Sequence, residues 1–356
     1  MRVGVHLISP SEQDVSEWGV APEHARRYVL QTLRAAAALQ NATEFVLFHG
    51  AEERFSAEPF PCVPLELARA GWFRRTSSPA RSLKQAVRSE RVDVMLSPLQ
   101  SADLDLGIPQ VYFACDLRPW ESEPGAPPAK VAHIGALRKA CADSRALVAP
   151  SNYIRQRFLE LFDVPLNHTV VAAAGVPSAF AQNHSSMVAK PYLLLHDDSP
   201  GRENACMIVS ALEKHATRFP FPVVLIGAGV GEESPLDDRV VYIEHCPDVQ
   251  LAGLYQQCEA FVACGRGDGG ASRVIEALGA GCCVIAPHSP ATTELVADGP
   301  FYYNPGSTSS LMQALGRVLD QGPQEHGQRV RHGKAIAARF TWEQTAWKLL
   351  SAFKRI

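Results

Sequence analysis

The feature that most constrains the fold is an alternation of short apolar runs, rich in β-branched residues, with longer segments of helical periodicity. In the first half, strand-like runs cover residues 2–9, 44–50, 92–98, 109–116 and 146–151, and helical patterns cover 22–39, 80–90, 132–144 and 152–162. This order is typical of parallel sheets built from strand–helix–strand units. The sequence therefore predicts an α/β protein.

The same alternation restarts after a polar stretch, QNHSSMVAK, at residues 182–190, which has the composition of a linker. Strand-like runs then cover residues 191–196, 222–229, 239–245, 259–264 and 282–287, and helical patterns cover 203–219, 249–258, 272–281 and 311–321. We predict two tandem Rossmann-like domains with parallel sheets and a cleft between the domains, lined by the carboxyl ends of both sets of strands. The predicted domains are residues 1–181 and 191–340.

Composition and charge narrow the class of protein. The chain has 356 residues, of which 46% are hydrophobic, so two ordinary cores can be buried. A net charge of −3 gives no reason to expect a nucleic-acid partner. No apolar run approaches the ~20 residues that span a bilayer, and residues 1–10 lack the apolar core of a signal peptide. We therefore expect a cytoplasmic protein.

The nine cysteines show neither CxxC nor Cys/His ligand spacing. Scattered through apolar segments, they fit buried hydrophobic side chains in a reducing compartment better than disulfides or a zinc site. The adjacent Cys282 and Cys283 begin a predicted strand and are interpreted as packing. We expect no structural metal.

A glycine-rich stretch, GRGDGGASRVIEALGAG, lies between the strand-like runs at 259–264 and 282–287. It is interpreted as a glycine loop followed by a helix, with Ser272 as the N-cap. Glycines let a ligand approach the backbone, and a helix N-terminus offers free N–H groups to an anion such as phosphate. Glu276 lies one turn into this helix, where its carboxylate could accept hydrogen bonds from a ribose diol. The alternative is a structural acid that pairs with Arg273.

The order of residues in this stretch resembles the signature of family 4 glycosyltransferases of the GT-B fold. That signature runs from a first acid through glycines and apolar positions to a glutamate eight residues later. The matching residues are Asp268, Gly269, Gly270, Ala271, Val274, Ile275, Glu276, Ala277, Gly279 and Gly281, followed by the strand CVIAP.

The resemblance extends over nearly the whole chain. Residues 291–315 resemble the family's next loop, strand and turn, with Glu294 at the family's glutamate, and Gly227 lies where the family places the nucleotide base. Residues 146–176 resemble the segment that closes the N-terminal domain. Residues 341–356 resemble the terminal helix that crosses back to the first domain.

The resemblance implies retaining transfer of a sugar from a nucleotide-diphosphate sugar, without a cofactor or a required metal. The acceptor would be a glycan or a lipid-linked precursor, bound on the N-terminal side. It assigns catalytic roles to Asp116 and Asp268. It assigns donor binding to Glu276, Gly269, Gly270, Ala271, Gly227 and Glu294. Arg202, Arg266 and Arg273 join this set from their spacing and not from the resemblance.

Departures from the family pattern bear on activity. The family's paired glycines after the first strand are replaced at residues 22–25 by PEHA, and the histidine of its histidine–aspartate pair is Cys115, before Asp116. Its diphosphate-binding arginine aligns with Asp197 or Asp198, and its lysine aligns with Glu203. Acids here repel a diphosphate. The compensating cations would be Arg202, Arg266 and Arg273, since guanidinium groups bind phosphate in a bidentate fashion.

Two functions from different classes follow. The first, which we favour, is the glycosyltransferase, because Glu276 and the glycine loop are kept and arginines are gained beside them. The second is a non-catalytic partner or scaffold subunit of an active glycosyltransferase, favoured by the altered motifs. Residues 71–91 carry six basic side chains and one acidic side chain. Such a stretch binds peripherally at the inner face of an anionic membrane or, more often, is a solvated helix face.

Overall fold

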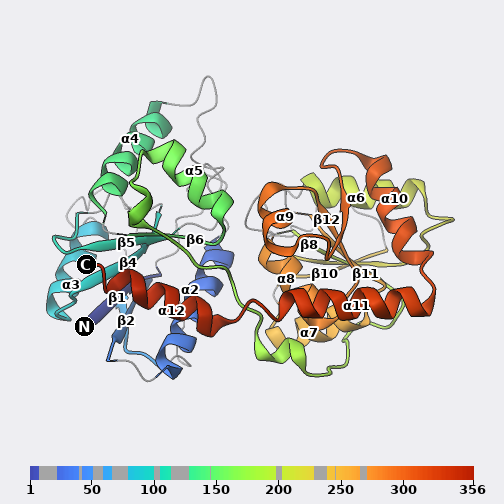
Figure 1. The fold of residues 1–356 in the computed structure, drawn as a ribbon, viewed down its shortest axis with the longest axis horizontal. Helices are drawn as coiled ribbons and strands as arrows, with labels where there is room; N and C mark the ends of the chain where they lie inside the picture. The colour runs from blue at the N-terminus through green and yellow to red at the C-terminus, as the bar shows by residue number, and fades with distance from the viewer. Residues whose placement is uncertain are drawn as a thin grey trace, which may run out of the picture. The chain divides into compact units, whose positions relative to one another are not determined.

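The computed structural model describes residues 1–7, 22–39, 42–50, 59–65, 79–99, 105–113, 128–144, 146–197, 203–227, 239–244, 246–264 and 271–356. The chain divides into two compact units. The first contains Met1–Ala172 and Glu343–Ile356, and the second contains Ala173–Trp342. Both chain ends therefore belong to the first unit (Figure 1).

The first unit is built on a seven-stranded sheet with the order β3-β2-β1-β4-β5-β6-β7, in which every adjacent pair is parallel. Its strands are β1 (Arg2–His6), β2 (Glu44–Gly50), β3 (Cys62–Leu65), β4 (Val94–Pro98), β5 (Gln110–Phe113), β6 (Ala146–Ala149) and β7 (Thr169–Val171). Its helices are α2 (Pro22–Ala38), α3 (Pro79–Ser89), α4 (Pro128–Asp143), α5 (Asn152–Phe162) and most of α12 (Trp342–Phe353), with a short 3-10 helix η3 (Leu166–His168).

The second unit repeats this plan with six parallel strands in the order β10-β9-β8-β11-β12-β13. Its strands are β8 (Leu193–His196), β9 (Val223–Ile226), β10 (Val240–Ile243), β11 (Ala260–Ala263), β12 (Val284–Pro287) and β13 (Phe301–Tyr303). Its helices are η4 (Ser178–Ala181), α6 (Glu203–Lys214), α7 (Asp248–Gln257), α8 (Ala271–Ala280), α9 (Pro290–Val296), α10 (Thr308–Leu319) and α11 (Pro323–Ala337).

Successive side chains of β8 pack into two different cores. Leu194 joins a cluster with residues of α7, α8 and α11, whereas Leu193 and Leu195 join a cluster with residues of α6 and α10. Helices thus cover both faces of the sheet, which is why its strands appear in the sequence as continuous apolar runs. The predicted α/β class, the two Rossmann-like domains and the return of the terminal helix to the first unit are confirmed.

Helix α11 was not predicted from the sequence, because its composition is polar and it contains Gly327 and Gly333. It begins with Pro323 at its first turn and packs along α8. A Cβ atom on Gly333 would lie 2.8 Å from Leu278 Cδ2, so glycine lets the two helices approach closely. Tertiary packing, rather than local periodicity, makes this segment part of the second core.

The residues predicted as a linker, 182–190, pack onto the second unit, and the division between the units falls instead between Ala172 and Ala173. Gln256 of α7 donates to the Gln182 carbonyl oxygen and accepts from the His184 amide, at 2.6 and 2.8 Å. Composition alone suggested a free segment, but its backbone groups find partners on α7. The segment is therefore packed against α7 and belongs to the second unit.

Gly253 of α7 gives a test of this packing. A Cβ atom there would lie 2.9 Å from the Ser185 carbonyl carbon and closer still to its oxygen. We expect Gly253→Ala to destabilise the protein by about 2 kcal/mol, because overlap with backbone outweighs the gain in helix propensity. Urea unfolding measures this change in the free energy of unfolding.

Gly327→Ala is the matched control. It also lies inside a helix, but the added Cβ would meet only the Arg331 guanidinium, at 3.4 Å. Helix propensity then dominates, and we expect stabilisation of up to about 1 kcal/mol. Equal effects of the two substitutions would contradict the close approach of Ser185 to α7.

Candidate functional site

The strand order of the second unit reverses direction between β8 and β11. From β8 the chain builds outward through β9 and β10, and then returns to place β11 on the other side of β8. In open α/β sheets, ligands bind outside the carboxyl ends of the strands at such a reversal. The residues that follow β8 and β11, and the first turns of α6 and α8, are therefore the candidate site.

Glu276 and Arg273 form the charged centre of α8. The Glu276 side chain is 1% exposed and the Arg273 side chain is 14% exposed, and Arg273 Nη1 lies 3.2 Å from Glu276 Oε2. Their spacing of three positions puts both on one helix face. A carboxylate buried this deeply requires a compensating cation, because burying an isolated charge is strongly unfavourable. The structural pairing predicted as the alternative is thus present.

The N-terminus of α8 differs from the prediction at one position. Ala271 begins the helix and is buried, so Ser272 lies within the first turn instead of capping it. Four further residues assigned to this loop lie outside the described residues: Arg266, Asp268, Gly269 and Gly270. The described part of the site is therefore the helix that follows the loop.

Asp197 follows β8 and is 2% exposed. Its Oδ2 accepts a hydrogen bond from the Ala205 amide at 3.1 Å, in the first turn of α6. This carboxylate therefore occupies the positive end of α6, where a ligand phosphate would otherwise find free N–H groups. The acid predicted to repel a diphosphate serves as a helix cap. Asp198 and Arg202 lie outside the described residues, and of Glu203 only the backbone, which begins α6, is described.

Gly227 and Glu294 lie on other elements. Gly227 follows β9, where its φ of 152° belongs to a region that residues with a Cβ rarely adopt, and its amide donates to the Ile243 carbonyl oxygen at 3.1 Å. Glu294 is exposed on α9, a helix that packs against α8. Of the described candidates, α8 carries Ala271, Arg273 and Glu276, while Gly227 and Glu294 come from a neighbouring strand and helix.

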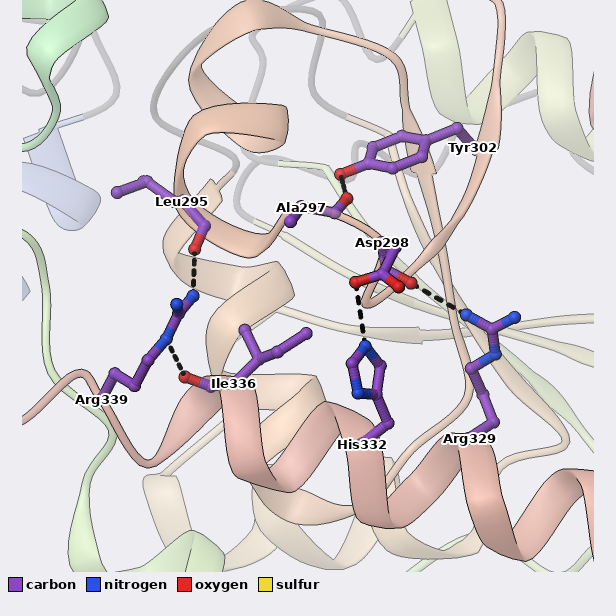
Figure 2. Close-up of polar contacts among 8 residues, drawn as sticks. All are labelled: Leu295, Ala297, Asp298, Tyr302, Arg329, His332, Ile336 and Arg339. Atoms are coloured by element: carbon purple, nitrogen blue, oxygen red, sulfur yellow. Dashed lines mark hydrogen bonds and ion pairs between the residues drawn. The ribbon is translucent and has the colours of Figure 1, made fainter.

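The end of α9 and the turn before β13 are held by side chains of α11 and of Arg339 just after it, which the sequence did not reveal (Figure 2). Arg329 Nη1 donates to the Asp298 carbonyl oxygen at 2.8 Å, His332 Nε2 lies 2.9 Å from Asp298 Oδ1, and Arg339 Nη2 donates to the Leu295 carbonyl oxygen at 3.1 Å. The hydrogen bond with His332 lowers the pKa of Asp298. Without a predicted α11, nothing in the sequence linked these residues to α9.

In the first unit, the strand order reverses between β1 and β4, so the end of β1 corresponds to the end of β8 in the second unit. His6 closes β1, next to the reversal between β1 and β4, and burial lowers its pKa to about 4. Residues 22–25, compared with the family's glycine loop, begin α2. Cys115 and Asp116 lie outside the described residues.

Among the described residues, no group of three or more His, Cys, Asp or Glu side chains is arranged to hold a metal ion. In the same part of the chain, no helix is long and apolar enough to cross a membrane. Of the basic stretch at 71–91, the described side chains begin at Arg81. On α3, Leu83 and Val87 are buried, while Arg81 and Arg88 are exposed.

Comparisons with known proteins place these features in context. Residues 197–321 match a family model described as glycosyl transferases group 1. This segment runs from Asp197 past α10 and includes all of α8. A search of curated protein sequences found no match.

Several solved structures share the fold over the full chain. Sucrose-phosphate synthase from Thermosynechococcus elongatus is 14% identical, with a TM-score of 0.75, covering 100% of this chain and 98% of that one. Anabaena HepE in complex with UDP and glucose is 14% identical, with a TM-score of 0.73 and 100% coverage of both chains. WaaG, a glycosyltransferase involved in lipopolysaccharide biosynthesis, is 13% identical, with a TM-score of 0.72 and 98% coverage of both. These likenesses identify the GT-B fold.

Proposed function

We propose that this protein is a glycosyltransferase that moves a sugar, with retention of configuration, from a nucleotide-diphosphate sugar to a glycan or glycolipid precursor. The nucleotide binds the second unit at the carboxyl ends of β8 and β11. The enzyme needs no cofactor and no metal, and it works in the cytoplasm, with peripheral contact to the inner face of the membrane through residues 71–91.

The observation that carries the proposal is the placement of Glu276. A buried, charge-compensated carboxylate lies on the helix that follows the switch-point strand β11, inside the segment that matches glycosyl transferases group 1. Evolution of a stable core alone favours apolar side chains at such a position. A nucleotide sugar as substrate is further supported by the HepE structures, which hold UDP, UDP and glucose, or UDP-glucose.

Asp197 restricts where the donor diphosphate can bind. Since its carboxylate accepts from the Ala205 amide and places a negative charge at the N-terminus of α6, the phosphates bind at the first turn of α8, with Arg202, Arg266 and Arg273 as the compensating cations. Gly269, Gly270 and Ala271 let the phosphates approach the backbone, and Gly227 and Glu294 complete the donor pocket. Asp268 and Asp116 are the proposed catalytic residues.

A retaining transfer of this kind does not require a protein side chain as the general base. In a retaining transfer the departing diphosphate can accept the proton of the acceptor hydroxyl, while guanidinium groups and helix amides stabilise the charge that develops on the phosphate. The arginines would then supply most of the catalysis.

A specific observation favours a second candidate, a non-catalytic subunit that supports an active glycosyltransferase. Asp197 is buried and hydrogen-bonded as a helix cap at one of the two helix N-termini of the switch point. A chain selected only for its fold would keep such an internal cap. Binding of nucleotide distinguishes the two functions.

Calorimetric titration with a panel of nucleoside diphosphates and the matching nucleosides tests the proposal. We expect the wild type to bind a diphosphate, and Glu276→Gln to weaken binding of both diphosphate and nucleoside about tenfold or more through loss of the ribose contact. Arg273→Ala should weaken binding of the diphosphate more than binding of the nucleoside, because it removes a phosphate cation as well as the partner of Glu276. Glu213→Gln, on the exposed face of α6, is the matched control and should bind as the wild type.

Two outcomes would contradict the proposal at different levels. If the wild type binds no diphosphate at millimolar concentration, the transferase function is wrong and the scaffold subunit takes its place. If the wild type and Glu276→Gln bind equally well, the nucleotide site lies elsewhere. Circular dichroism of each variant shows whether its fold is intact.

A further inference from the structure

Two cysteines of the second unit lie in direct contact although 24 positions separate them. Cys258 Sγ and Cys282 Sγ are 3.3 Å apart. Cys258 is the C-cap of α7, where its amide donates to the Leu254 carbonyl oxygen, and Cys282 lies two residues before β12 begins at Val284. Cys258 is partly exposed, and Cys282 is 5% exposed. One cysteine is therefore partly exposed to solvent, and the other is buried in contact with it.

This arrangement differs from that of neighbouring cysteines in the described second unit. Cys283 Sγ, next in sequence, lies 3.4 Å from His326 Nδ1, and Cys264 Sγ contacts the Val262 carbonyl oxygen. Simple packing of small apolar side chains does not require two sulfur atoms to meet. Since a disulfide bond measures about 2.05 Å, the two thiols of Cys258 and Cys282 need to approach by little more than an ångström.

We propose that Cys258 and Cys282 are an oxidant-sensitive dithiol that hydrogen peroxide converts into a reversible disulfide. Peroxide first oxidises the accessible Cys258 thiol to a sulfenic acid, and one water leaves. The Cys282 sulfur then attacks the Cys258 sulfur, the S–S bond forms, and the sulfenic oxygen departs as a second water with the Cys282 proton. Two thiols are oxidised by two electrons and one peroxide is reduced to two waters.

The different burial of the two cysteines fits an order in which Cys258 is oxidised first and Cys282 reacts second. Desolvation raises the pKa of the Cys282 thiol, so Cys282 is a poor first nucleophile toward peroxide. It can act only on a sulfur that is already in contact with it. Cys258 is that sulfur, which restricts the second step to this pair.

The bridge would enclose the segment that carries the candidate site. Residues 259–281, between the two cysteines, contain β11 and α8, and hence Arg273 and Glu276. Closing this loop restricts the unfolded chain, so we expect the melting temperature of the oxidised protein to rise by about 5 °C. The inference does not depend on the proposed transferase function.

The test uses the full chain, fully reduced, then treated with hydrogen peroxide, denatured and alkylated. Intact mass should show a product that has lost two hydrogen atoms and binds two fewer alkyl groups, and dithiothreitol should reverse it. Because Cys282 and Cys283 fall in one peptide, variants assign the partner. Cys258→Ser and Cys282→Ala should form no bridge, whereas the matched control Cys283→Ala should form it as the wild type does.

In Cys282→Ala, the sulfenic acid at Cys258 should persist long enough to be trapped by dimedone, which distinguishes a lost partner from a misfolded protein. A bridge that survives in Cys258→Ser, or one that disappears in Cys283→Ala, would overturn the proposal. So would a wild type that keeps all its thiols or forms only irreversible oxidation products.

Discussion

Replacing Arg273 with methionine is expected to destabilise the protein by about 3 kcal/mol, because it leaves the Glu276 carboxylate buried without its cation. The Glu276 side chain is 1% exposed, and its Oε2 lies 3.2 Å from the guanidinium. Methionine retains much of the apolar stem of arginine, so the loss reports mainly on the charge. Urea unfolding at neutral pH measures the free energy of unfolding.

A double-mutant cycle separates this pair from the rest of α8. Glu276→Gln keeps the shape and removes the charge, so the combined variant Arg273→Met/Glu276→Gln should recover most of the lost stability. We expect a coupling energy of roughly 1 to 3 kcal/mol between the two positions. Arg218→Met is the control, since its ion pair with Asp320 is largely exposed and should change stability little. Additive effects at Arg273 and Glu276 would be inconsistent with the buried pair.

We expect the pKa shift of His6 to lower the free energy of unfolding by about 2.5 kcal/mol when the pH falls from 7 to 4.5. Burial at the end of β1 lowers its pKa from 6.5 to about 4. In this interval the unfolded chain binds a proton that the folded protein excludes, so stability is full above the unfolded pKa and falls as the pH drops toward the folded pKa. Urea unfolding at several pH values measures the slope.

The variant His6→Phe removes the titrating ring while keeping an aromatic side chain at the end of β1. Its stability should depend less steeply on pH than that of the wild type between pH 6.5 and pH 4.5, and the difference between the two cancels the contribution of carboxylates. His215→Phe, at an exposed position on the segment after α6, should keep the wild-type slope. If His6→Phe and the wild type show parallel curves, the His6 ring is protonated in the folded protein as readily as in water.

Much of the fold could be predicted because buried parallel strands carry their signal locally. The segment at 152–162 was predicted as a helix and is α5, with Ser151 as its N-cap and Asp163 in a left-handed conformation at its end. The strand-like run at 191–196 contains β8, whose side chains pack into cores on both faces. In such elements the chain's own periodicity and turn residues agree with the tertiary structure, so no distant contact is needed to recognise them.

The candidate site could be predicted only in part. The glycine loop and the helix after it pointed to α8 and to Glu276, and the alternative pairing with Arg273 was visible in the spacing of three residues. The role of Asp197 could not be predicted, because a carboxylate at the end of a strand can repel a ligand or cap the next helix. Only the hydrogen bond to the Ala205 amide shows which of these it does in this structure.

By itself, the sequence determined the α/β class, the two sheets and the helix that carries Glu276, because apolar runs, helical periodicity and glycine turns act over a few neighbouring residues. Only the tertiary structure decided that α11 covers α8, that residues 182–190 belong to the second unit, and that Cys258 meets Cys282. These features depend on contacts between segments far apart in the chain. Their energy comes from packing and from backbone groups that find partners elsewhere, which no local pattern encodes.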